Sequence, residues 1–236
     1  MKPSWIPTQK IIDNSNIYQM MREKGFENYQ DFWNWSVTNK EDFWEATVDK
    51  LGIVQSERFT SILDTSDGVE NAQWLKNSRL NIIDSCFQND PQAAAILFQK
   101  KTGPIQTITR KTLLKLVNRI ANGLVNLGLG RNDSIAIDLP MTVEAVAIYL
   151  AAIKAGIVVV TIADSFSSKE IAVRLKITKP KLLFTQDVLI RAGKELPLYN
   201  RVIEADAPKT VIIKTSDKSM AIRKGDIHWD SFLSAD

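Results

Sequence analysis

The chain has 236 residues, of which 44% are hydrophobic and 24% charged, and its 30 basic and 27 acidic side chains give a formal net charge of +3. This composition is ordinary for a globular protein and excludes collagen-like and wholly disordered chains. The single cysteine, Cys86, excludes an intramolecular disulfide framework and a cysteine-rich metal site. The single histidine, His228, excludes multi-histidine metal sites and is the one candidate base for Ser/His or Cys/His catalysis.

Charge is distributed unevenly along the chain. Residues 1–99 carry 9 basic and 14 acidic groups, a balance of −5, whereas residues 100–236 carry 21 basic and 13 acidic groups, a balance of +8. Two interpretations remain open: solvated faces that happen to segregate, or a second half that meets a phosphate-bearing ligand. The weak net charge does not by itself indicate a nucleic-acid partner, and we expect none.

Signals for membranes and targeting are missing from the sequence. No apolar run approaches the roughly 20 residues that span a bilayer. The N-terminus lacks the apolar core of a signal peptide, and the final Ser234-Ala235-Asp236 is not a peroxisomal address. The sequence therefore predicts a cytoplasmic chain without a membrane span, and its length predicts one large or two small domains.

Residues 1–85 are polar and aromatic, with weak periodicity and frequent turn-forming residues. We predict short helices here that pack aromatic side chains onto a larger body; an aromatic platform for a ligand is the alternative. Cys86, in the apolar stretch that follows, is predicted to behave as a small buried hydrophobe. Five of the six tryptophans fall in this region: Trp5, Trp33, Trp35, Trp44 and Trp74.

From residue 93 the pattern changes to alternating strands and helices. The apolar run at 93–98 and the stretch at 105–109 predict the two strands of a hairpin. Apolar residues then recur at helical spacing from Leu113 until Gly128 stops the helix. The next predicted elements are a strand at 134–139, ended by Pro140, and a helix at 143–153 that ends at Gly156.

The alternation continues in the last third of the chain. Residues 157–162 are apolar without alternation, which is typical of a strand buried on both faces of a parallel sheet. Ser167 and Glu170 fit a capping box that begins the next helix. Strands that alternate with helices predict an α/β fold with a mostly parallel sheet and flanking helices. Further strands are predicted at 181–185, 201–203 and 210–213.

The turn Arg191-Ala192-Gly193-Lys194 is the most suggestive local arrangement. We expect it to follow a strand and a short helical turn, so that two cations three residues apart face the same way around a glycine. Such a pair suits a terminal phosphate through charge-assisted hydrogen bonds; a solvated basic turn is the alternative. A phosphate-binding G-x-x-x-x-G-K-[ST] loop is not present in the sequence.

From Tyr29 to Ile213 the sequence resembles the N-terminal part of acetyl-CoA synthetase-like acyl-activating enzymes, which belong to the adenylate-forming superfamily. The order and spacing of the matching segments make the resemblance specific, and several are most similar to the plant-type branch, some of whose members are peroxisomal. The segments include Phe43-Trp44-Glu45, Leu139-Pro140-Met141, Ala151-Ala152-Ile153-Lys154-Ala155-Gly156, Ala163-Asp164-Ser165-Phe166-Ser167 and Phe184-Thr185-Gln186-Asp187.

The resemblance implies a helical, aromatic-rich N-terminal extension over residues 1–88 and an incomplete adenylation domain over 89–236. The family makes acyl-CoA from a small carboxylic acid in two steps, first an acyl-adenylate and then attack by the thiol of CoA, with ATP, Mg²⁺ and CoA in the complete enzyme. It implies that Arg191 and Lys194 contact the 3′-phosphate of CoA and that Phe166 lies near CoA. Residues 163–166 replace the family's glycines at that point.

Departures from the family are as informative as the matches. The phosphate loop, the adenine and ribose motifs and the catalytic lysine of relatives lie beyond the part matched here, so we expect no catalytic residue in this chain and at most CoA as its ligand. The first hypothesis is therefore the N-terminal portion of an acyl-CoA synthetase that is inactive alone. The alternative is a non-catalytic truncated paralogue that binds CoA or pairs with a complementary polypeptide, the missing C-terminal part or a second copy.

Overall fold

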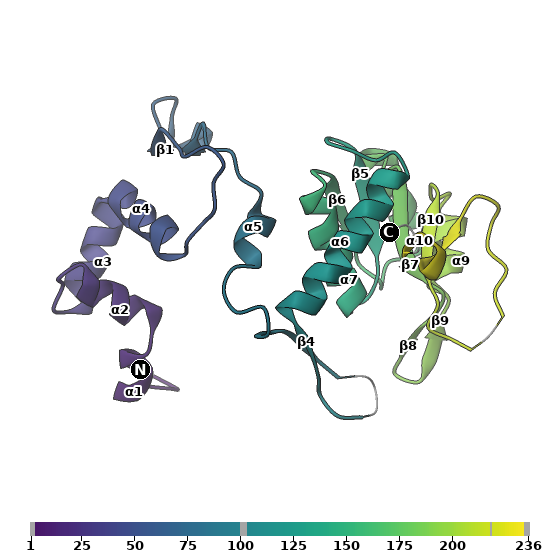
Figure 1. Cartoon of the computed structure of the whole chain (residues 1–236), viewed down its shortest axis with the longest axis horizontal. Coiled ribbons are helices and arrows are strands. Elements are labelled where there is room, and N and C mark those ends of the chain that lie inside the picture. Colours follow the sequence, from purple (N-terminus) through teal and green to yellow (C-terminus); the bar gives the residue numbers. More distant parts are fainter. Residues whose placement is uncertain (1–2, 100–102, 218, 234–236) are drawn as a thin grey trace. The chain divides into compact units, whose positions relative to one another are not determined.

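The computed structural model describes residues 3–99, 103–217 and 219–233 (Figure 1). The chain divides into two compact units, Met1–Leu80 and Asn81–Asp236. The predicted boundary between residues 88 and 89 stays a prediction. Within the described ranges, we find no helix whose length and apolar character would let it cross a membrane.

In its described residues, the first unit holds four short helices, one β-hairpin and a 3-10 turn. Phe32 is buried at its centre, and the rings of Phe26, Trp35 and Phe43 lie 5.8, 5.7 and 6.1 Å from it. Edge-to-face and tilted ring contacts of this kind bury large apolar areas. The short helices are thus as predicted, but these aromatic side chains pack on one another within the unit, and their packing onto a larger body stays a prediction. The hairpin was not predicted. The elements are α1 (Gln9–Asp13), α2 (Asn16–Glu23), α3 (Tyr29–Thr38), α4 (Lys40–Lys50), β1 (Ser61–Asp64), the 3-10 turn η1 (Val69–Asn71) and β2 (Gln73–Lys76).

The second unit begins with a short helix, a hairpin and the longest helix. The strands at 94–98 and 106–109 pair antiparallel, which confirms the predicted hairpin. Thr109 caps the following helix by accepting the amide of Thr112, and Gly128, at φ +80°, follows its end. These elements are α5 (Ile82–Cys86), β3 (Ala94–Phe98), β4 (Gln106–Thr109) and α6 (Arg110–Asn126).

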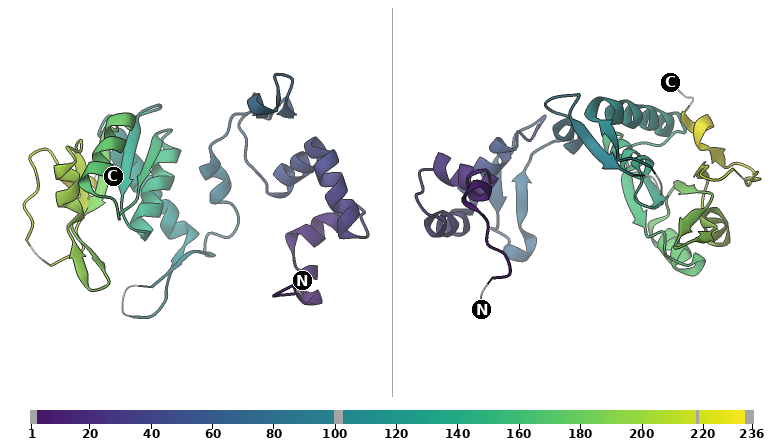
Figure 2. Two further views of the ribbon diagram at one scale, coloured as in Figure 1. Left: turned by 180° about the vertical axis from the view of Figure 1, so that it is seen from behind. Right: turned by 90° about the horizontal axis from the view of Figure 1, so that it is seen from below.

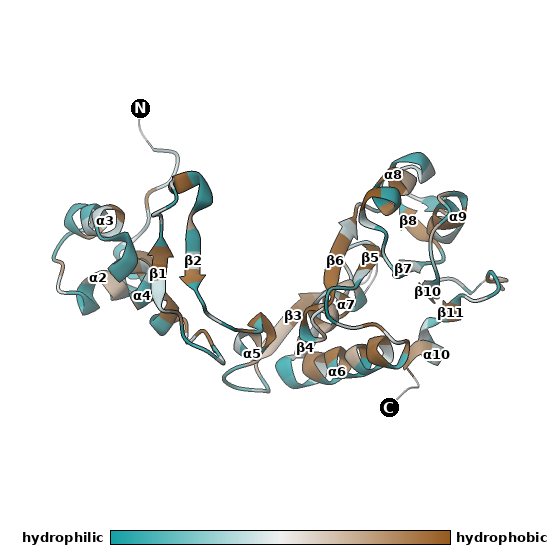
Figure 3. Ribbon diagram, turned by 90° about the horizontal axis from the view of Figure 1, so that it is seen from above, coloured by the Kyte–Doolittle hydropathy of each residue, from teal (hydrophilic) through white to brown (hydrophobic). Residues whose placement is uncertain are grey.

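A five-stranded parallel sheet in the order β11-β10-β7-β5-β6 forms the core of the second unit. The brown strands and the mixed brown and teal surfaces of the helices in Figure 3 show how apolar residues gather at this sheet. The elements are β5 (Ser134–Asp138), α7 (Val143–Lys154), β6 (Val158–Ile162), α8 (Ser168–Thr178), β7 (Leu182–Gln186), β8 (Leu189–Arg191), β9 (Lys194–Leu196), α9 (Leu198–Glu204), β10 (Thr210–Ile213), β11 (Ile227–His228) and α10 (Trp229–Leu233).

Helices cover both faces of this sheet. α6, α7 and α10 pack on the face that carries Ile135 and Ile137, and α8 and α9 pack on the face that carries Ala136. Successive side chains of a strand point to opposite faces, so the two apolar clusters alternate along β5. The α/β fold with flanking helices is therefore confirmed.

The strand order reverses between β5 and β7. The chain leaves β5 toward β6 at one edge and returns to β7 on the other side of β5. α7, which follows β5, and α9, which follows β7, lie on opposite faces. In open α/β sheets, ligands bind at the carboxyl ends of the strands where the order reverses. The loops at this edge are therefore the expected place for a ligand-binding site.

Three local predictions outside the basic turn are wrong. Residues 201–203 lie in α9 and not in a strand, since Val202 and its neighbours bury one helical face against β7 and α8. β6 is an edge strand whose Val158 is 53% exposed, because it has a strand partner on one side only among the described residues. Cys86 is exposed, because it is the last residue of the five-residue helix α5, in which Ile83 is the buried residue.

Candidate functional site

The basic turn is the tip of a two-stranded hairpin formed by β8 and β9, which projects from the second unit (Figure 1, Figure 2). Ala192 and Gly193 have φ of +48° and +78°, as a two-residue turn of the mirror-image type requires. The predicted short helical turn before Arg191 is thus wrong. Arg191 and Lys194 are directly paired across the strands, so both side chains leave the same face.

An ion pair joins this hairpin to the loop after β6. Nη2 of Arg191 donates to both carboxylate oxygens of Asp164, at 3.0 and 2.8 Å. The Arg191 side chain is 52% exposed, whereas that of Asp164 is 14% exposed. The loop at 163–167 and the Arg191 turn, separate in the sequence, are therefore brought together at the carboxyl edge of the sheet.

Arginines from two helices, α8 and α9, also contact the loop at 163–167. Nη1 of Arg201, in α9, donates to the carbonyls of Asp164 (3.0 Å) and Phe166 (3.4 Å). The guanidinium of Arg174, in α8, lies 3.9 Å from the centre of the Phe166 ring. These contacts anchor Phe166 and the Asp164 backbone to the body of the unit.

The predicted capping box is present at the end of this loop. Ser167 accepts the amide of Glu170, and the Glu170 carboxylate accepts the amide and hydroxyl of Ser167. The hydrogen bond from the Ser167 amide, followed by that from its hydroxyl, holds the pKa of Glu170 below its usual range. The loop is therefore closed at its C-terminal end by the start of α8.

Asp138 is the last residue of β5, a strand inside the five-stranded sheet. It is 1% exposed, and neither carboxylate oxygen has a hydrogen-bond partner among the described residues. Burial raises the pKa of Asp138 to about 7; the nearby charge of Arg201 lowers it and that of Asp164 raises it. Asp138 was not singled out from the sequence, although a carboxylate that ends an otherwise apolar strand just before a proline is a usable signal.

Asp187, just after β7, is the opposite case. It is 4% exposed, and its carboxylate accepts the amides of Val188, Thr215 and Ser216 and both hydroxyls of the latter two. Burial acts to raise the pKa of Asp187, but the bonds from Ser216 and Thr215 outweigh it and the pKa is lowered. Asp187 thereby fastens the segment after β10 to the end of β7.

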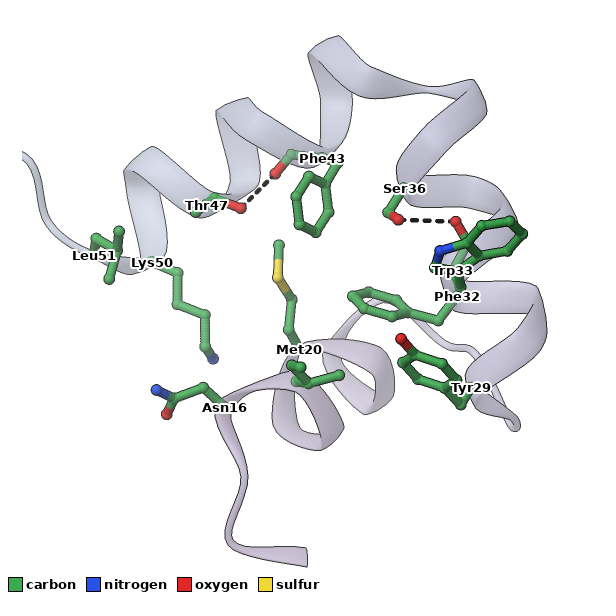
Figure 4. Close-up of a pocket in the computed structure, with 11 residues that line it drawn as sticks. Asn16, Met20, Tyr29, Phe32, Trp33, Ser36, Phe43, Thr47, Lys50 and Leu51 are labelled. Atoms are coloured by element: carbon green, nitrogen blue, oxygen red, sulfur yellow. Dashed lines mark hydrogen bonds between the residues drawn. The ribbon is translucent and has the colours of Figure 1, made fainter. Parts of the chain in front are cut away.

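A separate pocket of about 350 Å³ lies within the first unit, between α2, α3 and α4 (Figure 4). Its walls are mostly apolar and include Met20, Phe32 and Phe43. Lys50, which points into it, forms an ion pair with Glu23 at 2.7 Å. Neither Phe166, Arg191 nor Lys194 lines it, so it is independent of the site predicted from the sequence.

Comparisons with known proteins follow this division of the chain. Residues 84–231 match the model of the AMP-binding enzyme family, and residues 29–86 match that of the acetyl-coenzyme A synthetase N-terminus. In structure, the chain is similar to the acetoacetyl-CoA synthetase from Streptomyces lividans, with a TM-score of 0.88 and 23% identity over 100% of this chain and 38% of that one. This last similarity concerns the fold.

Similar curated proteins carry names of acyl-activating enzymes. One from Arabidopsis thaliana, "Probable acyl-activating enzyme 17, peroxisomal", is 38% identical over 98% of this chain. The "Hexanoyl-CoA synthase" of Cannabis sativa is 36% identical over 98%, and the "Acetyl-coenzyme A synthetase" of Methanothrix thermoacetophila is 30% identical over 96%. The chain spans about a third of their length, 35% of each. Because a family model matches well over half of its residues, the chain belongs to the AMP-binding enzyme family, with the N-terminal region of acetyl-coenzyme A synthetases.

Proposed function

We propose that this chain is the N-terminal portion of an ATP-dependent acyl-CoA synthetase. The complete enzyme would join a carboxylate to ATP, releasing pyrophosphate, and the thiol of CoA would then displace AMP from the acyl-adenylate. ATP and Mg²⁺ belong to the first step and CoA to the second. Within this chain, we assign to Arg191 and Lys194 the binding of the 3′-phosphate of CoA.

The paired cations of the hairpin are the observation that carries this assignment. Like charges directly opposite each other on two strands destabilise a hairpin, yet Arg191 and Lys194 stand in that relation. An anion between them turns the repulsion into two charge-assisted hydrogen bonds. A phosphate monoester offers the charge and the oxygens that such a pair needs.

Phe166 completes the proposed site. Its loop is joined to the hairpin by the ion pair between Asp164 and Arg191. With Arg174 stacked on it, the aromatic ring is held in a fixed place. A purine stacks readily on such a ring, so we assign to Phe166 a contact with the adenine of CoA while the two cations hold its phosphate.

Binding of CoA by the 236-residue chain tests the assignment. We expect Arg191→Ala with Lys194→Ala to weaken CoA binding at least about tenfold in calorimetric titrations, since two charge-assisted bonds are lost. Binding of 3′-dephospho-CoA should change less than about twofold because it lacks the phosphate. The matched control is Lys111→Ala with Lys115→Ala, which removes equal charge from α6 on the other face of the sheet. An equal loss with both ligands would refute the phosphate assignment.

Isotope exchange between ATP and pyrophosphate tests the reaction itself. We expect none from this chain alone, because transfer of an adenylyl group needs preorganised cationic groups around the developing charge. Robust exchange would overturn that expectation.

The alternative hypothesis, a non-catalytic CoA-binding chain, requires a native polypeptide of 26.6 kDa in its source cells; a substantially larger mass would exclude it.

A further inference from the structure

The ion pair between Asp164 and Arg191 uses the part of the guanidinium that a phosphate would need. A guanidinium grips two oxygens through either of two edges, one formed by Nη1 and Nη2 and the other by Nε and Nη2. Nη2 is common to both edges. Since Nη2 of Arg191 donates to both oxygens of Asp164, an anion that binds either edge through two bonds shares this nitrogen with the carboxylate and meets its negative charge there.

The two partners of this pair differ in how firmly they are held. The Asp164 side chain is mostly covered, and its own carbonyl accepts a bond from Arg201. Arg191 lies next to the tip of an exposed hairpin and is itself half exposed. Ion pairs that reach water contribute little to stability and are easily exchanged. Arg191 can thus turn from Asp164 to a ligand, whereas the carboxylate stays in place.

The charges of Arg191, Lys194 and Asp164 also indicate that Asp164 competes with a phosphate for Arg191. Arg191 and Lys194 supply two positive charges, and Asp164 neutralises one of them. Among the described residues, Lys194 is in no ion pair. A carboxylate beside the phosphate position also repels the incoming anion directly.

We propose that Asp164 is an internal competitor of the ligand's phosphate for Arg191, and so sets how strongly the site distinguishes 3′-phosphorylated CoA from its dephosphorylated form. This inference rests on the phosphate site proposed above. The carboxylate acts through Arg191: in the free protein it holds Nη2 of the guanidinium, and a phosphate that binds there competes with it for that nitrogen. Asp164 lowers affinity for the phosphate while leaving contacts to the rest of the ligand unchanged.

The test is a set of calorimetric titrations of the 236-residue chain with CoA and with 3′-dephospho-CoA at low ionic strength. We expect Asp164→Asn to bind CoA about fivefold more tightly, with affinity for 3′-dephospho-CoA changed by less than about twofold. Asn keeps the size of the side chain and removes its charge. The matched control is Glu204→Gln, which removes a carboxylate bonded to Ser168 beside the same loop and should leave both affinities unchanged.

A double-mutant cycle with Arg191→Ala separates competition from other effects. If Asp164 acts through Arg191, Asp164→Asn should tighten CoA binding clearly less in the Arg191→Ala background than in the wild type. Unchanged or weaker CoA binding by Asp164→Asn, with a native thermal transition, would overturn the proposal and indicate that the carboxylate orients Arg191 for its ligand. If the wild-type chain binds both ligands equally, the proposed phosphate site itself falls, and the competition with it.

Discussion

Two buried aspartates, Asp138 at the end of β5 and Asp187 just after β7, differ in how their carboxylates are surrounded. Asp187 is surrounded by donors, and its pKa is lowered. Asp138 has no hydrogen-bond partner among the described residues, and burial raises its pKa to about 7. Both lie at the carboxyl edge of neighbouring strands. Position in the sheet therefore does not determine the charge of a carboxylate; the donors that surround it do.

The two carboxylates also differ in their roles: that of Asp187 holds other parts of the chain in place, whereas that of Asp138 holds none by a hydrogen bond among the described residues. The Asp187 carboxylate is occupied by main-chain amides and hydroxyls that need it as an acceptor. The charges of Arg201 and Asp164 act on Asp138 in opposite directions, and Asp164 is also the partner of Arg191 in the proposed phosphate site. A change in the charge of either neighbour therefore changes the pKa of Asp138.

The largest effect should come from Asp187→Ala. Its loss leaves three amides and the Ser216 hydroxyl without their acceptor, whereas the Thr215 hydroxyl keeps the carbonyl of Val188, and we expect the free energy of unfolding to fall by about 3–5 kcal/mol. Urea denaturation of the second unit measures it. Asp187→Asn, which keeps one acceptor oxygen, should lose clearly less. Equal stability of the wild type and the Ala variant would contradict the structural role of Asp187.

Asp138→Asn should have the next largest effect, with the opposite sign at neutral pH. The unfolded carboxyl titrates near 3.8 and the folded one at about 7, so the folded state holds the extra proton and stability falls as pH rises between these values. The Asn variant lacks this titration. Since each pKa unit corresponds to roughly 1.4 kcal/mol, we expect it to be up to about 4 kcal/mol more stable than the wild type at pH 8, and its advantage nearly to disappear near pH 4. Parallel stability profiles from pH 4 to 8 would show that Asp138 titrates normally.

The smallest expected effect is a shift in the pKa of Asp138 when Arg201 is replaced. Arg201→Gln removes a positive charge that lowers the pKa of Asp138, so that pKa should rise further, by up to about one unit. Carboxyl-carbon chemical shifts followed by NMR against pH measure it directly. The matched control is Arg174→Gln. Arg174, in α8, is stacked on Phe166, and its replacement should leave the titration midpoint of Asp138 unchanged. A downward shift in the Arg201 variant would refute this electrostatic account.

Much of the second unit could be predicted from its sequence because its signals are short-range. The helical spacing after Leu113, the stop at Gly128 and the capping box of Ser167 all depend on residues within a few positions of one another. The errors have the opposite origin. Residues 201–203 are β-branched and arginine, yet they form part of α9 because one face packs against β7. The hairpin of β1 and β2 has no clear alternation, and its pairing appears only in three dimensions.

The candidate site divides in the same way. Arg191, Lys194 and Phe166 were identified from the sequence by residue type and family resemblance. Asp164 was noticed only as a replaced glycine, and its ion pair with Arg191 joins segments on either side of α8. The strand-end position of Asp138 could have been noticed in the sequence, but its lack of hydrogen-bond donors and the nearby charge of Arg201 depend on the tertiary structure.

The sequence by itself determined the alternation of strands and helices, the family and the two cations that flank a glycine turn, since each is written in residues close together in the chain. Tertiary structure alone decided which carboxylates are charged and which partners the cations meet. The physical reason is that desolvation and ion pairing depend on groups brought from β5, the loop after β6, the hairpin and α9. Those distances are set by packing around the sheet.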